Sequence, residues 1–488
     1  MNMKNLFKNN FITFLIVHFL VWCGIPQLRP SLPMDSIEAI MWGRYCDWGT
    51  NKHPPLSGFP ASWFYDWFGS AGIYILSQVC VLFGFIYIYK LAKCFLEEKK
   101  AVLAVMVLEG VIYYGFSSME YNVNVLSLAL WPATSYYFYL AVRDGKWPHW
   151  ALTGLFAGLN VMNKYVGGVL LLCMAAYMLF TSQGRAKFKT FGPYLTFAVF
   201  LAIIAPHLVW LYKHDFYVVG YFAGRAAHEA SESVWWEVAE HFYFPLKFLL
   251  AQILFMLLAL AVYFLTYRKA EKEASEPSAA QLQFLKFMGI LPVLVFAAVS
   301  FVFGLKMKSM WGFPVMYMLG ILLFVYYPFR LTERLYKKTV RSVYVVMGLL
   351  AVAATAIIVF DRSEKINFPG AAFAEKMSEI WKKHTGSDLA YAGGEIWYVS
   401  NVALYGESNP KPVAEMKPEH NPWLSAQDIM QKGALVIFPD RSRILELRKI
   451  YKNMSLPYEY KLEIKNKAGK VKKKTIYYGF LKPEVKND

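Results

Sequence analysis

Long apolar runs recur through the first three quarters of the 488-residue chain. Each is roughly 20 residues long, which is the length that an α-helix needs to cross the hydrocarbon core of a bilayer. Short polar joints such as 143–146 separate the runs. The pattern predicts about eleven membrane-spanning helices. They cover residues 9–28, 71–92, 100–117, 122–142, 149–163, 165–182, 192–212, 244–266, 285–304, 312–329 and 341–360.

Polar residues interrupt this pattern at two places. Asn160, Asn163 and Lys164 fall within or between the short spans 149–163 and 165–182, so one of that pair could be a re-entrant element. Glu109 is the one acid inside a span, and acids at such positions are rare and often functional. It could equally pair with His207 or Lys164 as structural support, and we leave it out of the predicted catalytic set.

After residue 360 the chain becomes mixed and polar, without a further spanning run. Periodicity predicts helices over 373–383 and 443–452 and strands over 388–392, 434–438 and 475–481. We therefore expect a transmembrane domain over 1–360 and a soluble α/β domain over 361–488. The basic stretch 465–474 indicates a solvated hairpin, or alternatively a patch that meets anionic headgroups.

Composition supports a polytopic α-helical membrane protein, since 57% of the residues are hydrophobic and only 17% are charged. Much of the net charge of +17 comes from Lys and Arg in every second loop between spans, so the charge does not indicate a nucleic-acid partner. By the positive-inside rule, the N-terminus is cytoplasmic and the C-terminal domain is outside, in the periplasm of a bacterium. A Walker A loop, a GxGxxG after a strand and an HExxH are all absent from the sequence.

This orientation places the loop after the first span outside. The loop carries Asp35 and Glu38, followed by Lys52-His53-Pro54-Pro55-Leu56. If residues 34–48 form a short helix, the two carboxylates share a face near its start. They could serve only to cap that helix and meet its positive end, or one of them could be a catalytic base.

Several motifs resemble those of the GT-C membrane glycosyltransferases. The closest likeness is to bacterial members of glycosyltransferase family 39, the protein-mannosyltransferase-like group that includes relatives of lipid A aminoarabinose transferase. The motifs are Asp35-Ser36-Ile37-Glu38-Ala39, Trp42-Gly43-Arg44, Lys52-His53-Pro54-Pro55-Leu56, Asn122-Val123-Asn124, Lys164-Tyr165 and Met310-Trp311-Gly312-Phe313-Pro314.

The resemblance implies a GT-C fold and an inverting transfer of a sugar from a polyprenyl-phosphate donor to an acceptor hydroxyl, without a nucleotide cofactor. Asp35 matches the catalytic acid of the family. Many relatives have adjacent Asp and Glu, whereas here Ser36 follows Asp35 and the second acid is Glu38. Glu38 could orient Asp35, raise its pKa as a like charge, or bind an acceptor hydroxyl.

A second departure concerns metal. Lys52 stands where the aminoarabinose-transferase relatives carry an acid. His228 and Glu232, which have metal-ligand spacing, make only a partial ligand set. We therefore expect no metal site.

The remaining predicted site residues are cations and polar groups near the outer ends of spans. Lys52, His53, Lys164 and Lys306 are expected to bind the donor phosphate, and Asn122, Asn124, Trp42 and Arg225 to bind substrate. Asn122 and Asn124 could instead be helix caps. The cations could instead extend to lipid headgroups, an alternative that is strongest for Arg225.

The sequence leaves the sugar and the acceptor open. A lipopolysaccharide, lipid A or other glycolipid acceptor is favoured, and a protein O-mannosyltransferase-like enzyme is the alternative within the family. A sugar-lipid transporter or flippase is a third possibility, but it would place polar residues at the bilayer midplane. The expected partners are the donor, the acceptor and membrane lipids, and the expected state is a monomer in the bacterial inner membrane.

Overall fold

The computed structural model describes residues 3–45, 47–226, 234–273, 277–417, 421 and 423–483. The chain forms two compact units. The first, here called the membrane unit, comprises Met1–Ile25, Lys52–Ser57 and Tyr74–Ala353. The second, here called the C-terminal unit, comprises Pro26–Asn51, Gly58–Ile73 and Ala354–Asp488.

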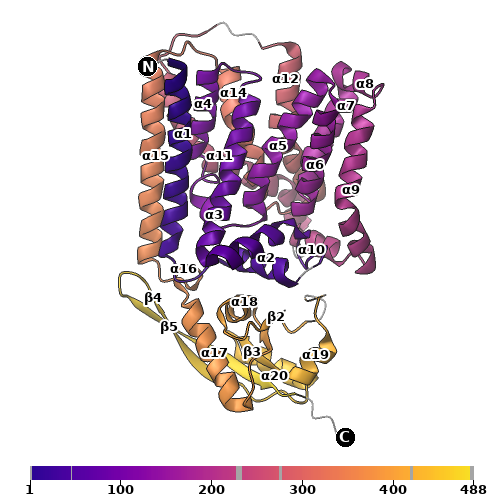
Figure 1. The fold of residues 1–488 in the computed structure, drawn as a ribbon, viewed down its shortest axis with the longest axis vertical. Coiled ribbons are helices and arrows are strands. Elements are labelled where there is room, and N and C mark those ends of the chain that lie inside the picture. The colour runs from indigo at the N-terminus through magenta and orange to yellow at the C-terminus, as the bar shows by residue number, and fades with distance from the viewer. Residues whose placement is uncertain are drawn as a thin grey trace. The chain divides into compact units, whose positions relative to one another are not determined.

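The membrane unit is a bundle of helices (Figure 1). Its α-helices are α1 (Met3–Gly24), the later part of α3 (Gly58–Ala92), α4 (Glu98–Met106), α5 (Val123–Asp144), α6 (Trp147–Asn163), α7 (Gly167–Phe180), α8 (Ser182–Lys187), α9 (Gly192–Lys213), α10 (Tyr217–Ala226), α11 (Val234–Tyr267), α12 (Ala279–Leu285), α13 (Leu291–Phe303), α14 (Leu319–Tyr326) and most of α15 (Glu333–Phe360). The tighter turns η2 (Pro55–Ser57), η3 (Val107–Gly110), η4 (Phe116–Met119) and η6 (Ser309–Met318) and a π-helical turn, η5 (Lys286–Ile290), complete it.

Eight helical segments of the described residues are long and apolar enough to cross a membrane. All eleven predicted spans coincide with helical structure, but three of them are shorter than a full span. Residues 149–163 correspond to α6, with 17 residues, and 165–182 to α7, with 14. Residues 100–117 leave the α-helix after Met106 and continue through η3 and η4.

The break in the third predicted span lies next to a buried acid. Glu109 is fully buried and accepts hydrogen bonds from Trp22 Nε1 at 2.7 Å and from His18 Nδ1 at 2.6 Å, both on α1. Buried charges need such partners because burial removes their hydration. The predicted pairing of Glu109 with His207 or Lys164 is therefore wrong, and α1 supplies the partners instead.

The C-terminal unit contains a mixed five-stranded sheet of order β2-β1-β3-β5-β4. Its strands are β1 (Tyr391–Gly394), β2 (Lys411–Ala414), β3 (Ala434–Phe438), β4 (Tyr458–Lys465) and β5 (Val471–Leu481). The first three pair in parallel, and β5 pairs antiparallel with both β3 and β4. Its helices are α2 (Met34–Tyr45), η1 (Ile25–Leu28) from Pro26 onward, the start of α3, α16 (Glu364–Asn367), α17 (Gly370–Thr385), α18 (Ile396–Tyr405), α19 (Ala426–Lys432) and α20 (Arg441–Ile450).

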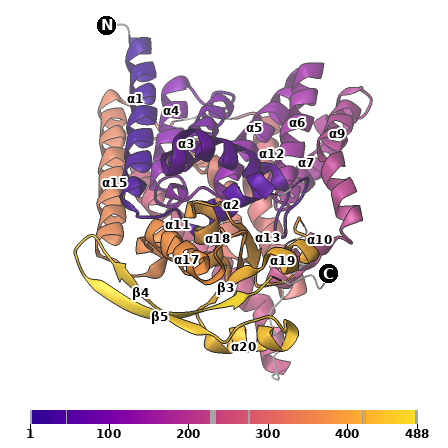
Figure 2. The same ribbon diagram turned by 60° about the horizontal axis from the view of Figure 1, so that its bottom comes forward.

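Helices cover both faces of this sheet (Figure 2). Successive residues of a strand point to opposite faces. On β3, Leu435 and Ile437 accordingly join one buried cluster with α17 and α18. Val436 and Phe438 join the other, with α19 and α20. This burial on both faces explains the uninterrupted apolar sequence of β3.

The polytopic helical architecture and the C-terminal α/β domain predicted from the sequence are confirmed. Strand 434–438 coincides with β3, and the predicted helices fall on α17 and α20. The basic stretch 465–474 is the β4–β5 hairpin, on which Lys473 pairs with Glu463 across the strands at 2.9 Å. The sequence did not predict β2, β4, α18 or α19.

The first loop belongs to the C-terminal unit. Ser31 Oγ donates to the Phe368 carbonyl oxygen at 2.9 Å, and the Leu32 amide donates to the Tyr405 hydroxyl at 2.9 Å. Burial raises the pKa of Tyr405 to about 12, so its hydroxyl stays protonated at neutral pH. The domain boundary predicted at residue 360 stays a prediction. The contacts of the first loop place it in the same unit as residues 354–488.

Close packing of α14 on α4 generates a stability prediction. A Cβ added at Gly320 would lie 1.9 Å from the Ala104 carbonyl oxygen, whereas a Cβ at Gly348 on α15 would meet nothing within 4 Å. We expect Gly320→Ala to destabilise the protein by about 1–3 kcal/mol, because backbone must move to make room. Gly348→Ala should leave stability unchanged or slightly raised. Thermal unfolding in detergent compares the two, and equal melting temperatures would contradict the predicted contact.

Candidate functional site

The predicted catalytic acids lie on α2 of the C-terminal unit. The helix starts where the Ile37 amide donates to the Pro33 carbonyl oxygen at 3.0 Å, and Asp35 is in its first turn. A carboxylate there is favoured by the positive end of the helix. Asp35 is exposed and has no hydrogen bond or ion pair with the described residues of its unit. Its carboxylate is therefore accessible to a substrate.

Glu38 and Trp42 are in a different environment from Asp35. Both are on the same helix, but only 5% of Glu38 and 6% of Trp42 is exposed. The i, i+3 spacing of the acids on a helix is as predicted, yet one carboxylate faces solvent and the other is buried. This difference makes Asp35 the better candidate for a group that contacts substrate, and Glu38 the better candidate for a supporting role.

The same helix ends in an ion pair that the sequence did not reveal. Arg44 donates to Asp66 Oδ1 at 2.5 Å, and its guanidinium lies 5.2 Å from the centre of the Tyr65 ring. Gly43 permits the close approach of the start of α3, since a Cβ there would lie 2.1 Å from the Gly58 carbonyl oxygen. Gly43 and Arg44 thus have a packing role.

The polar residues at the N-terminal end of α5 form a cluster in the membrane unit. We call it the Lys164 cluster and define it as Ser57, Tyr121, Asn124, Asn163 and Lys164. The Tyr121 hydroxyl donates to the Ser57 carbonyl oxygen at 2.9 Å, so the turn that follows His53 meets the start of α5. Asn163 Nδ2 donates to the Val123 carbonyl oxygen at 2.7 Å, which joins the end of α6 to the same place.

A buried cation lies within this cluster. Lys164 follows the last residue of α6 in extended backbone and is 6% exposed. Its ammonium donates to Asn124 Oδ1 at 2.6 Å. A cation is buried at low cost only when hydrogen bonds replace its hydration, so Asn124 holds Lys164 in place.

Asn122 has the alternative role considered from the sequence. Its side-chain oxygen accepts from the amides of Asn124 at 2.8 Å and Val125 at 3.3 Å, which makes it the N-cap of α5. Its amide group donates to the Glu120 carbonyl oxygen at 3.2 Å. Substrate binding by Asn122 stays a prediction, and it would use a side-chain oxygen that already accepts hydrogen bonds from the first amides of α5.

The other predicted site cations lie outside the Lys164 cluster. Lys52 and His53 are half-buried beside the turn η2, and Lys306 is exposed in the joint after α13. The end of α5, with Arg143, and the start of α12 line one pocket at one end of the unit. Both α5 and the α12–α13 segment cross the unit from there. Lys306, after α13, therefore lies at the opposite end, together with the Lys164 cluster. Arg225 is in α10, and its side chain is outside the described part. Residues 227–233, with His228 and Glu232, also lie outside the described residues.

Two further polar groups near this end were not among the predicted site residues. The Tyr165 hydroxyl is 2.8 Å from His207 Nε2, a bond that links α9 to the segment after Lys164. Glu240, near the start of α11, is 6% exposed. Asn163 had a sequence signal, as a polar interruption of an apolar run. The sequence indicated His207 only as a possible partner of Glu109. Among the described residues, no group of three or more His, Cys, Asp or Glu is placed to hold a metal ion.

Comparisons with known proteins agree with this architecture. A family model described as dolichyl-phosphate-mannose-protein mannosyltransferase matches residues 52–210, which include the His53 turn and the Lys164 cluster. Over 327 residues the chain is 24% identical to the lipopolysaccharide core galacturonosyltransferase RgtB of Rhizobium johnstonii. That match covers 63% of this chain and 63% of the length of the relative.

Solved structures of ArnT from Cupriavidus metallidurans are similar over nearly the whole chain. The structure bound to undecaprenyl phosphate matches with a TM-score of 0.66 at 14% identity, and covers 96% of this chain and 97% of that one. The apo structure matches with a TM-score of 0.62 at 13% identity and the same coverage. The chain is thus a multi-pass membrane protein with the GT-C fold, and the predicted resemblance to the GT-C membrane glycosyltransferases is confirmed.

The bond between Asn124 and Lys164 generates a testable prediction. Asn124→Leu removes an acceptor from a buried ammonium, so we expect it to lower stability by about 1.5–3 kcal/mol. Asn124→Asp keeps the acceptor and should retain most of the stability. Thermal unfolding of both variants in detergent provides the measurement. An Asn124→Leu protein as stable as the parent would show that this bond does not hold Lys164.

Proposed function

We propose that this protein is an inverting glycosyltransferase that moves a sugar from a polyprenyl-phosphate-linked donor to an acceptor hydroxyl. The observation that carries the proposal is the exposed Asp35 carboxylate at the first turn of α2, at the position that the family resemblance assigns to the catalytic acid. The buried and hydrogen-bonded Lys164 provides independent support, because it is a fixed cation suited to a phosphate.

The chemistry requires one base and one stabilised leaving group. Asp35 accepts the proton of the acceptor hydroxyl as its oxygen attacks the anomeric carbon of the donor. The bond from that carbon to the phosphate oxygen breaks, and the polyprenyl phosphate leaves with the electron pair. Attack from the opposite face inverts the configuration. The leaving group is already an anion, so it needs cations and hydrogen-bond donors and no separate acid.

The cations of the membrane unit are suited to the donor phosphate. Lys164 and Lys306 are the principal candidates, and Lys52 and His53 precede the turn that meets the start of α5. Trp42, Asn122, Asn124 and Arg225 are assigned to substrate binding. Because the sequence has Lys52 where related enzymes carry an acid, the proposed reaction uses no divalent metal.

The relatives support a polyprenyl-phosphate donor and a glycolipid acceptor. ArnT binds undecaprenyl phosphate in one of its structures, and the relative from Rhizobium is named for lipopolysaccharide core. Lys and Arg gather in the joints at one end of the bundle, and the positive-inside rule makes that end cytoplasmic. The Lys164 cluster then faces the periplasm of a bacterial inner membrane, where the C-terminal domain also lies. We propose that the protein acts there as a monomer.

A protein acceptor is the second candidate. The description of the matching family model, a protein mannosyltransferase, favours it. Mass spectrometry of envelope glycolipids and of secreted proteins, with and without the gene, distinguishes the two. Loss of a sugar-sized increment from a glycolipid supports the first candidate, and loss from a protein supports the second. A transporter or flippase predicts neither change.

The role of Asp35 is tested by Asp35→Asn, which removes the base and keeps the size of the side chain. We expect transfer to fall by about 10²–10⁴-fold, the usual contribution of a general base. Asp47→Asn is the matched control, because Asp47 is an exposed acid of the same loop. Transfer is measured as the modified fraction of the acceptor in cells that lack the native gene. Full transfer by Asp35→Asn would remove Asp35 from the catalytic role.

The role of Lys306 is tested by Lys306→Met. Removing a cation from the donor site should weaken binding of undecaprenyl phosphate about tenfold, the loss of roughly one charge-assisted hydrogen bond. Lys213→Met is the control, since Lys213 is an exposed lysine at the end of α9. Binding is measured by titration of the purified protein in detergent. Equal affinities for the two variants would exclude Lys306 from the donor site.

A further inference from the structure

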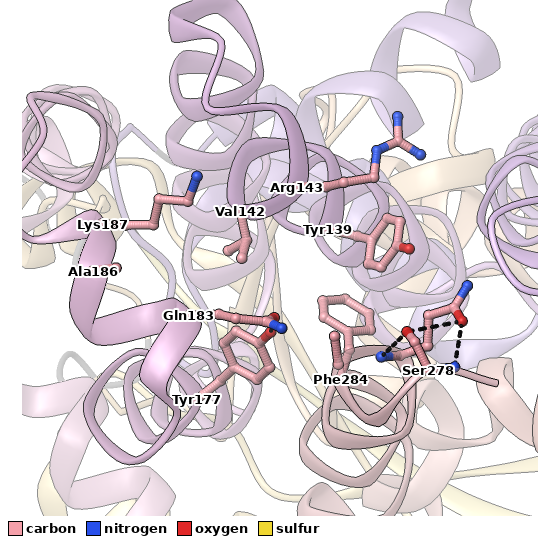
Figure 3. A pocket seen from close by; sticks show the side chains of 11 residues that line it. Tyr139, Val142, Arg143, Tyr177, Gln183, Ala186, Lys187, Ser278 and Phe284 are labelled. Carbon is pink, nitrogen blue, oxygen red and sulfur yellow. Dashed lines mark hydrogen bonds between the residues drawn. The ribbon is translucent and has the colours of Figure 1, made fainter.

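A pocket lies in the membrane unit, at the end opposite the Lys164 cluster. It has a volume of about 580 Å³ and is lined by residues of α5, α7, α8 and the start of α12 (Figure 3). The last turns of α5 form one wall, and along the helix axis they lie about 22–28 Å from Asn124, which binds Lys164. This pocket is therefore separate from the candidate donor site.

Two cations line the pocket. Arg143 reaches it from α5 and Lys187 from α8, with Val142 between them (Figure 3). The guanidinium of Arg143 binds the carboxylate of Asp144 at 2.6 and 3.0 Å, which neutralises one charge. Lys187 is half-buried and makes no ion pair with any residue that the structure describes. The lining thus keeps a net positive charge.

The remaining lining is aromatic and neutral. Tyr139, Tyr177 and Phe284 pack together, with the Phe284 ring centre 4.9 Å from Tyr139 and 5.8 Å from Tyr177. The Tyr177 hydroxyl donates to Gln183 Oε1 at 2.9 Å, so it is already satisfied. Ser278 and Gln281 bond each other as the capping box of α12. A ligand here would meet an apolar wall and a cationic edge, which fits an amphipathic anion.

The surroundings indicate that the pocket lies at the depth of lipid headgroups. Trp147 is the first residue of α6, Phe180 is the last residue of α7 and Phe191 is the N-cap of α9, and each is more than two-thirds exposed. Large aromatic side chains at the ends of membrane helices are typical of the interface between headgroups and acyl chains. A ligand reaching this pocket from the side would therefore come from the bilayer.

We propose that this pocket binds the phosphate headgroup of an anionic phospholipid of the leaflet at this end of the bundle. Basic pockets between membrane helices on the cytoplasmic side bind such headgroups in other proteins. The phosphate lies between Lys187 and Arg143, and the apolar part of the lipid lies against Tyr139, Tyr177 and Phe284. The site is independent of the proposed transfer reaction.

The test is titration of the purified protein in detergent with phosphatidylglycerol and, in parallel, with phosphatidylcholine, with bound lipid measured by native mass spectrometry. Phosphatidylglycerol should bind more tightly. Lys187→Gln should weaken the binding of phosphatidylglycerol about fivefold, which corresponds to about 1 kcal/mol for one cation near an anionic headgroup. Lys189→Gln is the control, because Lys189 is exposed in the same joint and outside the lining.

A second variant separates a pocket from diffuse surface charge. Ala186→Trp fills the pocket without changing any charge, and Ala186 is exposed, so the fold should tolerate it. It should also abolish the preference for phosphatidylglycerol. Unchanged binding by Ala186→Trp, or an equal loss for Lys187→Gln and Lys189→Gln, would overturn the proposal. Displacement of the lipid by millimolar glycerol 3-phosphate would reassign the pocket to a soluble phosphate ester and overturn the lipid assignment.

Discussion

A polar side chain inside a membrane bundle must find its partners within the protein, because the hydrocarbon around it offers none. This requirement determines where the membrane unit can carry chemistry. Glu109 is satisfied by two side chains of α1 and is sealed from solvent, so it acts as an internal tie. Lys164 is also buried and is held by Asn124, but it lies at the end of α6, near the start of α5 and the turn η2. Helix ends combine a fixed cation with nearby solvent and headgroups, which suits them to the phosphate of a lipid-linked sugar.

Much of this arrangement could be predicted from the sequence. Hydropathy located every span, because a helix in a bilayer needs a continuous apolar stretch. The polar interruption at Asn163 and Lys164 marked the cluster, and Asn122 had the residue type of a helix cap. The short joint between α5 and α6 makes them antiparallel neighbours, so the approach of Lys164 to the start of α5 follows from chain order.

Other features depend on contacts that sequence patterns do not encode. The α-helix ends at Met106, and in the next turn Glu109 bonds His18, which is 91 residues away in the chain. Strand β4 carries mixed polar residues on an exposed hairpin, so it lacked the apolar run that identified β3. The spacing of Asp35 and Glu38 was readable, but their different exposure was not. It results from the packing of α2 in a unit with α18, a helix that the sequence did not predict.

The way the first loop is held has a consequence for biosynthesis. Ser31 and Leu32 bond to partners 337 and 373 residues later in the chain. At a usual synthesis rate of about 5–20 residues per second, those partners emerge roughly 20–70 s after the loop itself. During that interval the bundle inserts while the helix bearing Asp35 lacks its support. Asp35 is thus fixed in its native setting only when the last part of the chain has folded, so a truncated product carries the Lys164 cluster without the native support of α2.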